Sequence, residues 1–286
     1  MGRKKLKKAL TPSDNIYKIF ANRINDYLNW LEECERSKRT IATYHSCLKN
    51  VIKYVNSNKA PVINKAVLTQ YKNELECNYK IRTANVYVGI INRYIKHLKL
   101  HEHCIKPIKI QQAMGIDNIL ELDEYTRLID YTKNQSNAKT YLIIRTLAST
   151  GMRVGELKFI TVESLTSGIA LVKNKNKFRE VIISNHIIAE LLDYCNDAGI
   201  SSGVIFNLHP SSIWRRIQAS AAQVGICKTK AHPHNLRHLF AKTYLNKTKN
   251  IASLAETLGH VNINTTLIYT RETNAERREK IESLEL

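Results

Sequence analysis

Four short motifs in the second half of the chain contain side chains that could handle a phosphate group. In the first, TGMRVGEL at 150–157, Arg153 lies in a turn between two predicted helices, and Glu156 can hold its side chain. The second is a lysine-rich turn at 173–177, between two stretches of β-branched residues. Guanidinium and ammonium groups bind phosphate oxygens, so both motifs suggest an anion site.

The other two motifs add histidines and a tyrosine. In HPHNLRH, a proline and an asparagine mark a helix start and bring His234, Arg237 and His238 within about one turn of each other. In the fourth motif, His260 follows a glycine that stops a helix, and Tyr269 comes nine residues later. Each residue alone has ordinary roles as a cap, an ion-pair partner or a core side chain, but the coincidence of all four motifs favours a functional site.

This set of side chains suits phosphoryl transfer without a metal ion. Arginines can hold the nonbridging oxygens of a phosphodiester, a tyrosine can attack the phosphorus, and histidine or lysine can exchange protons with the attacking and leaving oxygens. The HEHC cluster at 101–104 lacks a second ligand pair at zinc spacing, and no P-loop or HExxH motif occurs. We therefore expect a phosphodiester transesterase with no metal site.

The elements that must position these motifs are predicted to be mostly helical. The lysine-rich turn joins two predicted strands, 169–172 and 180–184. The first hundred residues contain four amphipathic helical segments, of which the first runs from Ile16 to Leu31. Apolar residues recur with a period near 3.6 in seven later segments: 122–132, 138–149, 186–197, 211–224, 235–247, 251–258 and 264–270.

A break in this periodic pattern divides the chain. Between His101 and about Asn118, proline, glycine and lysine interrupt any helix or strand. The chain has 286 residues, of which 43% are hydrophobic and 24% charged, and this is enough for two globular domains. We therefore expect two domains joined by a basic linker.

The charge of the chain predicts a polyanionic partner. Forty-four Lys and Arg residues against 25 Asp and Glu give a net charge of +19 and a pI near 9.7. Nucleic acid is favoured over a membrane, because no segment approaches the roughly 18–20 apolar residues of a spanning helix. Six widely spaced cysteines in a chain of this length favour a reducing, cytoplasmic location.

The motifs together resemble those of the tyrosine recombinase family, the phage-integrase and Xer-type site-specific DNA recombinases. TGMRVGEL resembles the family's first arginine motif T-G-x-R-x-x-E-L, and HNLRH matches its H-x-L-R-H motif. LGH at 258–260 and TLIY at 266–269 resemble its L-G-H motif and its nucleophile segment T-x-x-Y. Segments 37–55 and 82–100 are similar to helices of the family's core-binding domain, so the resemblance covers nearly the whole chain.

The resemblance implies a mainly α fold with a small β-sheet (α+β). A helical core-binding domain of the SAM-like type and a tyrosine-recombinase catalytic domain would form a C-shaped clamp on DNA. The tail would be a helix that docks on a neighbouring protomer or packs back on its own domain. The predicted boundaries are a basic arm at 1–14, the core-binding domain at 15–103, a linker at 104–118, the catalytic domain at 119–273 and the tail at 274–286.

The resemblance also implies the role of each site residue. Tyr269 would attack the scissile phosphate to form a 3′-phosphotyrosyl bond, Arg153 and Arg237 would hold the nonbridging oxygens, and His260 would hydrogen-bond the phosphate. His234 would be the acid/base partner of the tyrosine, with Glu156 and His238 in support. A hairpin lysine would protonate the leaving 5′ oxygen. Because such a transfer conserves bond energy, it would need neither a metal, ATP nor any other cofactor.

The hairpin lysine is where the sequence departs from the family pattern. Many members have a lysine five residues before an arginine, but Asn174 stands five before Arg179. We choose Lys175, on the assumption that the turn is one residue shorter, and Lys173 and Lys177 remain alternatives. The residues expected to bind DNA are Lys38, Arg39, Arg82, Lys106, Lys109, Lys173 and Lys177.

The expected substrate is double-stranded DNA with an inverted-repeat core site. One or two protomers would bind one site and a homotetramer would assemble on two, with a second recombinase or an accessory protein as a possible partner. The biological role would be Xer-like dimer resolution, or integration, excision or resolution of a mobile element, by a cytoplasmic, nucleoid-associated enzyme. The alternatives are a non-cleaving architectural or regulatory protein with the same fold and a type IB topoisomerase.

Overall fold

The computed structural model describes most of the chain as two compact units, Met1–Gln112 and Ala113–Leu286. The predicted arm, Lys175 and most of the predicted tail lie outside the described residues. The described residues are 16–57, 63–109, 119–135, 137–174, 177–260, 262–270, 278 and 281–284, without the side chains of Asn174 and Lys177.

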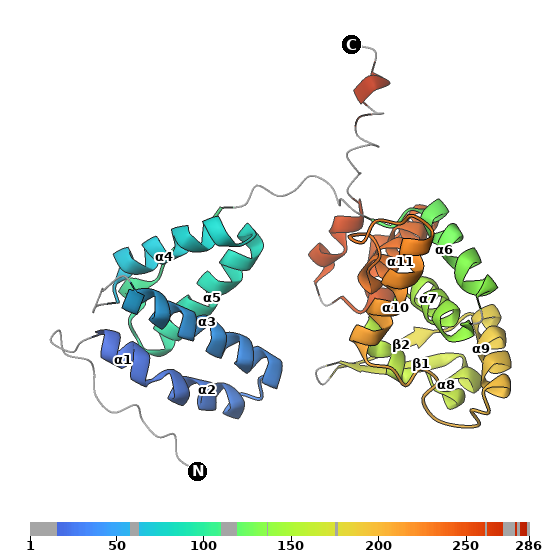
Figure 1. Cartoon of the computed structure of the whole chain (residues 1–286), viewed down its shortest axis with the longest axis horizontal. Helices are drawn as coiled ribbons and strands as arrows, with labels where there is room; N and C mark the ends of the chain where they lie inside the picture. Colours follow the sequence, from blue (N-terminus) through green and yellow to red (C-terminus); the bar gives the residue numbers. More distant parts are fainter. Residues whose placement is uncertain are drawn as a thin grey trace. The chain divides into compact units, whose positions relative to one another are not determined.

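The described part of the first unit is helical (Figure 1). Its elements are α1 (Ile16–Asn22), α2 (Ile24–Glu33), α3 (Lys38–Ser57), α4 (Lys65–Asn78), α5 (Ile81–His97) and the short 3₁₀ helix η1 (His101–His103).

Each helix of this unit buries one apolar stripe, as the periodicity predicts. The hydroxyl of Tyr94 on α5 is buried and donates a hydrogen bond of 2.6 Å to the carbonyl of Phe20 on α1. The predicted helix from Ile16 to Leu31 is divided at Arg23 into α1 and α2. Backbone hydrogen bonds from Arg23 to Ile19 and from Tyr27 to Arg23 continue across the division, so both helices bury the same stripe.

Two asparagines of α5 hold the segment that follows η1 against the first unit. The side chain of Asn92 accepts from the backbone N–H of Ile105 and donates to its carbonyl, at 3.0 and 2.8 Å. Asn85, seven residues earlier on α5, makes the same pair of bonds with Ile108, at 2.8 and 2.9 Å. Ile105 is 4% exposed and belongs to the core of the unit. The first part of the predicted linker, up to Ile108, is therefore packed on α5.

The second unit combines helices with one small sheet, which confirms the predicted mainly α fold. Its elements are α6 (Leu122–Asn134), α7 (Ala138–Thr150), η2 (Val154–Phe159), α8 (Val162–Ser167), β1 (Ile169–Asn174), β2 (Lys177–Ile182), α9 (Asn185–Asp197), α10 (Pro210–Gln223), α11 (Pro233–Thr248), α12 (Ile251–Leu258), η3 (Ile263–Thr265) and η4 (Leu267–Thr270).

Helix α7 is the centre of this unit. It contacts α6, α9, α10 and α11, and its residues Ile144 and Leu147 are fully buried. The helix ends at Gly151, whose φ of 62° is the left-handed conformation that glycine adopts without strain. The first arginine motif therefore leaves the end of a buried helix, which fixes its position.

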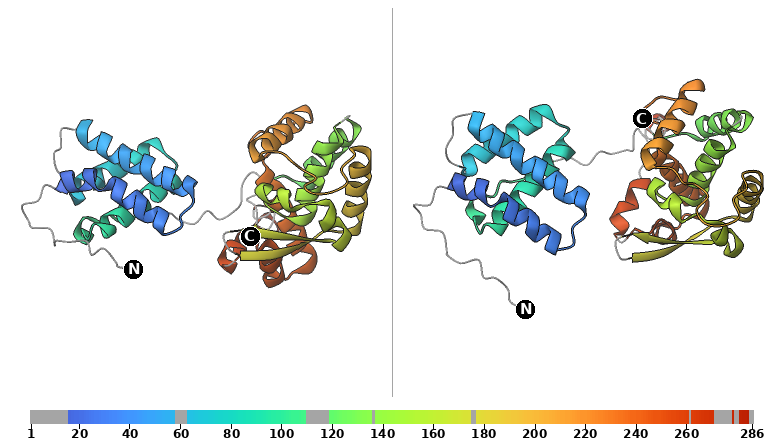
Figure 2. Two further views of the ribbon diagram at one scale, coloured as in Figure 1. Left: turned by 90° about the horizontal axis from the view of Figure 1, so that it is seen from below. Right: turned by 60° about the horizontal axis from the view of Figure 1, so that its bottom comes forward.

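Strands β1 and β2 form the predicted antiparallel hairpin, which lies at the edge of the helical unit (Figure 2). Val172 pairs with Arg179 and Lys173 with Phe178. The strands were expected to end at 172 and to begin again at 180, but they continue to Asn174 and from Lys177. Lys173, Asn174 and Lys177 of the lysine-rich segment are therefore in the strands, because cross-strand pairing extends to them.

The segment that carries the tyrosine packs in a small cluster beside the main core. Buried residues of this tyrosine cluster are Ala241, Leu254, Leu258 and Tyr269. The predicted helix at 264–270 is instead the two 3₁₀ helices η3 and η4. With three and four residues each, they are too short to nucleate an α-helix.

Gly151 allows a close contact between helices, and this contact makes a prediction. A Cβ added to Gly151 would overlap the ring of Phe240 on α11. Gly168 is a matched control, because its φ of 69° is similar but the nearest atom to an added Cβ lies 3.5 Å away. We expect Gly168→Ala to lose about 1–2 kcal/mol of unfolding free energy, and Gly151→Ala to lose about 1–3 kcal/mol more from overpacking. Urea unfolding measures both; equal losses would contradict the overlap.

None of the helices in the described part of the chain combines the length and apolar character needed to cross a membrane.

Candidate active site

Helix α11 supplies three of the predicted site residues from its first two turns. Pro233 is its first residue, and the side chain of His232 accepts from the backbone N–H of His234 at the helix start. Arg237 and His238 follow one turn later and face the interior of the unit. Arg237 is 1% exposed, which is rare for an arginine, so its guanidinium must find its hydrogen-bond partners within the protein.

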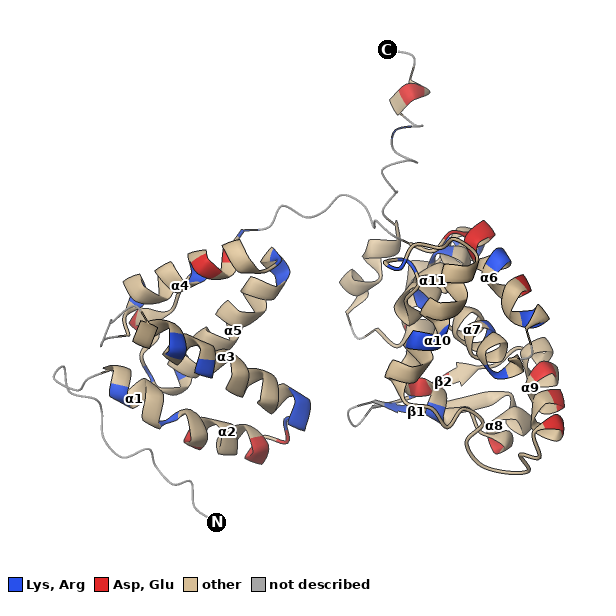
Figure 3. Ribbon diagram, viewed as in Figure 1, with Lys and Arg blue, Asp and Glu red and all other residues tan. Residues whose placement is uncertain are grey.

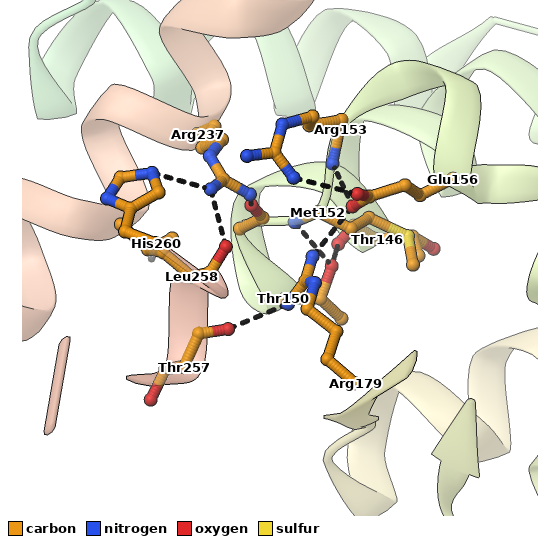
Figure 4. A network of polar contacts seen from close by, with 11 residues as sticks. Thr146, Thr150, Met152, Arg153, Glu156, Arg179, Arg237, Thr257, Leu258 and His260 are labelled. Atoms are coloured by element: carbon orange, nitrogen blue, oxygen red, sulfur yellow. Dashed lines mark hydrogen bonds and ion pairs between the residues drawn. The ribbon is translucent and has the colours of Figure 1, made fainter. Parts of the chain in front are cut away.

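The guanidinium of Arg237 joins the first and the fourth motif. Its Nη1 donates to the carbonyl of Gly151 at 2.6 Å, and its Nη2 donates to the carbonyl of Leu258 at 2.7 Å (Figure 4). Nη2 also lies 2.9 Å from Nε2 of His260. These contacts use three of the five N–H groups of an arginine. The remaining donors can bind an anion without breaking them.

Arg153 is held by the buried carboxylate of Glu156. Its Nη1 donates to Oε1 at 2.9 Å, and its backbone N–H donates to Oε2 at 2.8 Å. Arg179 on β2 donates to the same Oε2 at 2.6 Å. Burial would raise the pKa of Glu156, but the bond from the Arg153 backbone and the charge of Arg179 lower it below its ordinary value. Glu156 is therefore a carboxylate at neutral pH, as its predicted supporting role requires.

The contacts of His260 define its protonation state. Because Nη2 of Arg237 can only donate, Nε2 of His260 accepts, and Nδ1 then donates to Oγ1 of Thr266 at 2.9 Å. Burial and the charge of Arg237 lower the pKa of His260 to about 4. The imidazole is therefore neutral at neutral pH.

The hydroxyl of Tyr269 meets α11 at His238. Oη of Tyr269 lies 3.0 Å from Nδ1 of His238, and the tyrosine is 7% exposed. Burial raises the pKa of Tyr269, and Arg237 and Arg153 partly offset the rise. Burial and the charge of neighbouring His234 lower the pKa of His238 to about 4, so His238 is neutral at neutral pH. A neutral imidazole can accept the phenolic proton as a hydrogen bond.

His234 was expected to be the partner of the tyrosine, but its ring packs edge-on against His238, with ring centres 4.4 Å apart. Although His234 is exposed as a whole residue, partial burial of its ring and the charge of Arg237 lower its pKa. The structure thus brings both histidines to the same place and gives the direct contact with Tyr269 to His238.

The site carries an excess of positive charge. The guanidinium groups of Arg153 and Arg179 share the single carboxylate of Glu156, while no ion pair reaches Arg237 from the described residues. Burial and the charges of Arg153 and Arg179 lower the pKa of Arg237 to about 10, so it is still charged at neutral pH. Three cations and one anion leave a net charge of +2 beside a tyrosine hydroxyl. This arrangement is suited to a bound phosphodiester.

The hairpin lysines differ in what the structure describes. Lys173 is exposed, and its Nζ lies 5.4 Å from the ring centre of Phe178. Because side chains alternate along a strand, Lys173 and Phe178 lie on the face opposite to Arg179. Lys175 lies outside the described residues, and the side chain of Lys177 is not described. Of the three candidates, Lys173 is thus directed away from the site.

The other residues expected to bind DNA lie in the first unit and are exposed. Lys and Arg residues occur in both units (Figure 3). The exposed residues are Lys38 and Arg39 at the start of α3, Arg82 at the start of α5, and Lys106 and Lys109 in the segment after η1.

Sequence reasoning missed Arg179 and Thr266 as parts of the site. Thr266 holds His260, and it lies in the T-x-x-Y segment, which was the available signal. Arg179 lies two residues before the buried Val181 on β2 and therefore on the same, inward face, so the strand period was the signal for its direction. No cluster of His, Cys, Asp and Glu able to hold a metal ion occurs within the described ranges.

Comparison with known proteins identifies the family of the chain. The sequence pattern of the phage integrase family matches residues 118–276, which is more than half of the chain. The tyrosine recombinase XerA of Pyrococcus furiosus is 27% identical over 276 residues, covering 92% of this chain and 94% of that protein.

Solved structures show the same fold. The site-specific recombinase XerH bound to its difH substrate has a TM-score of 0.70 and 18% identity, over 96% of this chain and 91% of XerH. A lambda integrase tetramer bound to a Holliday junction has a TM-score of 0.67 and 16% identity, over 89% of this chain and 79% of the integrase chain.

Proposed function

Since the chain belongs to the phage integrase family of tyrosine recombinases, which recombine DNA at specific sites, we propose that it cuts and rejoins strands through a covalent 3′-phosphotyrosine intermediate. The observation that carries this proposal is the hydroxyl of Tyr269 placed beside the buried cation Arg237 in a site with excess positive charge. A phosphodiester supplies the missing negative charge and the atom that the tyrosine attacks.

In the proposed reaction, Oη of Tyr269 attacks the phosphorus, and the bond from phosphorus to the 5′ oxygen breaks. Arg153 and Arg237 hold the nonbridging oxygens. With DNA bound, His260 changes to the tautomer with its proton on Nε2, so that Nδ1 accepts from Thr266 and Nε2 donates to the phosphate. The phenolic proton leaves along the bond to His238, with His234 behind it, and a hairpin lysine gives a proton to the 5′ oxygen. The 5′-hydroxyl of a partner strand then attacks the phosphotyrosine and restores Tyr269.

The partner in this proposal is double-stranded DNA with two inverted half-sites. We extend it to four copies on two sites, because a structural neighbour is a tetramer on a Holliday junction. The tail at 274–286 docks on a neighbouring copy, and the enzyme works in the cytoplasm with the nucleoid. The net charge of +19 supports binding to backbone phosphates that depends strongly on salt.

Incubation with nicked DNA that carries the cognate site tests the proposal. Cleavage releases a short fragment that ends at the nick and carries the free 5′-hydroxyl, and this fragment diffuses away. The strand cannot be rejoined, so the 3′-linked protein–DNA adduct accumulates and is seen on a denaturing gel. If the protein binds this DNA but forms no adduct, the alternative of a non-cleaving DNA-binding protein is favoured. An adduct that rejoins only its own strand, and never a partner strand, would favour a topoisomerase.

The hairpin lysines give a second prediction. We expect Lys175→Ala to slow single-turnover cleavage by about 10²–10⁴-fold, because the leaving oxygen loses its proton donor. Lys173→Ala should leave the cleavage rate near that of the unchanged protein. It should weaken DNA binding and reduce the slope of log K against log salt concentration by about one, the value for one phosphate contact. Lys177→Ala tests the remaining candidate: if Lys177 is the proton donor, this variant shows the large loss of cleavage and Lys175→Ala does not. A large loss of cleavage with Lys173→Ala would contradict the direction of its side chain.

A further inference from the structure

Arg179 lies outside the four motifs, yet its side chain crosses the site. Its side chain is 15% exposed. Its Nη2 donates to Oε2 of Glu156 at 2.6 Å, and its Nη1 donates to the carbonyl of Thr257 at 2.7 Å. Its Nε is buried without a hydrogen-bond partner among the described residues. A buried N–H without a partner costs free energy. The two hydrogen bonds of the guanidinium must offset this cost, since the side chain stays in the site.

Gly259, the residue after the end of α12, leaves space for the side chain of Arg179 because it has no Cβ. A Cβ added to this glycine would overlap Cδ of Arg179 and would lie 3.0 Å from its Nε. The φ of Gly259 is 65°, so the position also favours glycine by its backbone conformation. The glycine of the L-G-H motif therefore has a second use, which is to let the arginine of β2 pass.

The two bonds of Arg179 connect the hairpin to both halves of the site. Glu156 also holds Arg153, and Thr257 precedes Leu258, whose carbonyl accepts from Arg237. Arg237 has a further anchor at the carbonyl of Gly151, and Arg153 holds Glu156 by its backbone N–H as well as its side chain, so neither depends on Arg179 alone. A two-stranded hairpin, in contrast, is only marginally stable by itself and takes its position from what its side chains contact.

We propose that Arg179 is a positioning residue that fixes the lysine-bearing hairpin against the phosphate-binding arginines. This inference rests on the proposed function and names the step that Arg179 serves, which is protonation of the leaving 5′ oxygen. Loss of Arg179 then impairs delivery of the proton more than binding of the phosphate. Lysine cannot replace it, because one ammonium group cannot make the two divergent bonds that a planar guanidinium makes.

The test compares two substrates in single-turnover cleavage by the full chain. One is the ordinary nicked DNA, and the other has sulfur in place of the bridging 5′ oxygen at the scissile phosphate. A thiol has a pKa of about 8.5, so the sulfur leaves as a thiolate without a proton donor. We expect Arg179→Lys and Arg179→Ala to cleave the oxygen substrate about 100-fold more slowly, and the sulfur substrate within about fivefold of the unchanged protein.

Arg145→Lys is the matched control. Arg145 is a partly buried arginine of α7 whose Nη2 pairs with Glu190 of α9 at 2.8 Å, outside the site. It should cleave both substrates at the rate of the unchanged protein. Fast cleavage of the sulfur substrate by the Arg179 variants also shows that they are folded.

Two results would overturn the inference about Arg179 alone: variants equally slow on both substrates, or variants as fast as the unchanged protein on both. The first would mean that Arg179 maintains the phosphate-binding groups, and the second that the hairpin is fixed without it. If the unchanged protein forms no adduct with either substrate, the proposed function fails and the inference falls with it.

Discussion

Tyr269→Phe abolishes the covalent adduct while the protein stays folded and still binds its DNA. The substitution removes one oxygen, the proposed nucleophile, and leaves the ring in the tyrosine cluster. The hydrogen bond to His238 is lost, which costs about 0.5–1.5 kcal/mol of stability. Cleavage should fall by more than about 10⁴-fold, because no other group can form the bond to phosphorus. The adduct is measured on a denaturing gel, and binding by gel shift.

Tyr244→Phe is the control for this substitution. Tyr244 packs against the same cluster, and its hydroxyl lies 2.7 Å from Oγ of Ser253. The control also loses one hydrogen bond in that cluster, yet it should form adduct at the rate of the unchanged protein. Adduct formed by Tyr269→Phe would assign the nucleophile to another residue.

Arg237→Lys slows cleavage by about 10³-fold or more, although the charge is kept. The guanidinium makes bonds to Gly151, Leu258 and His260 and still has donors for a phosphate. An ammonium has three donors on a flexible stem and cannot satisfy these acceptors and a phosphate together. Loss of one donor aimed at a developing charge costs about 10²–10³-fold, and here several donors are lost.

Binding of DNA should change little with Arg237→Lys, because one contact is a small part of a basic surface. Single-turnover cleavage and a gel shift at the same salt concentration separate the two effects. Arg145→Lys again controls for the exchange of arginine for lysine. A variant that binds DNA tightly and cleaves within tenfold of the unchanged protein would contradict the role of Arg237 in the phosphate clamp.

The sequence could predict which residues lie together in the candidate site because their motifs are local. His234, Arg237 and His238 lie within two turns of one helix, and helix-start signals were enough to place them together. Which histidine meets Tyr269 could not be predicted, because it depends on where η4 packs against α11. This is a tertiary contact, and no local pattern encodes it.

The partners of Arg179 also could not be predicted from local sequence. Its distance in sequence from Glu156 and Thr257 is 23 and 78 residues, so the network exists only after the hairpin and α12 have packed. The strand period gave the direction of the side chain, but its partners could not be known. The segment 264–270 was expected to be an α-helix, but it forms η3 and η4. A segment this short has little helix stability of its own, so its conformation depends on how it packs in the folded protein.

The segment after η1 was predicted as linker because it contains proline and lysine. The signal that it packs lay elsewhere, in two asparagines seven residues apart on α5, which is the spacing of one helix face. Side-chain amides can pair with an extended backbone as a neighbouring strand does. Composition of the segment itself could not reveal this, since the partner groups belong to α5.

The small size of the tyrosine cluster has a consequence for motion. The free energy of a local opening depends on the apolar surface that the opening exposes, and this cluster has few buried side chains beside the main core. Detaching η3 and η4 therefore costs less than opening α7. We therefore expect Tyr269, the proposed nucleophile, to leave the site and return in a local opening that keeps the rest of the unit folded, so that this short segment would set when cleavage can occur.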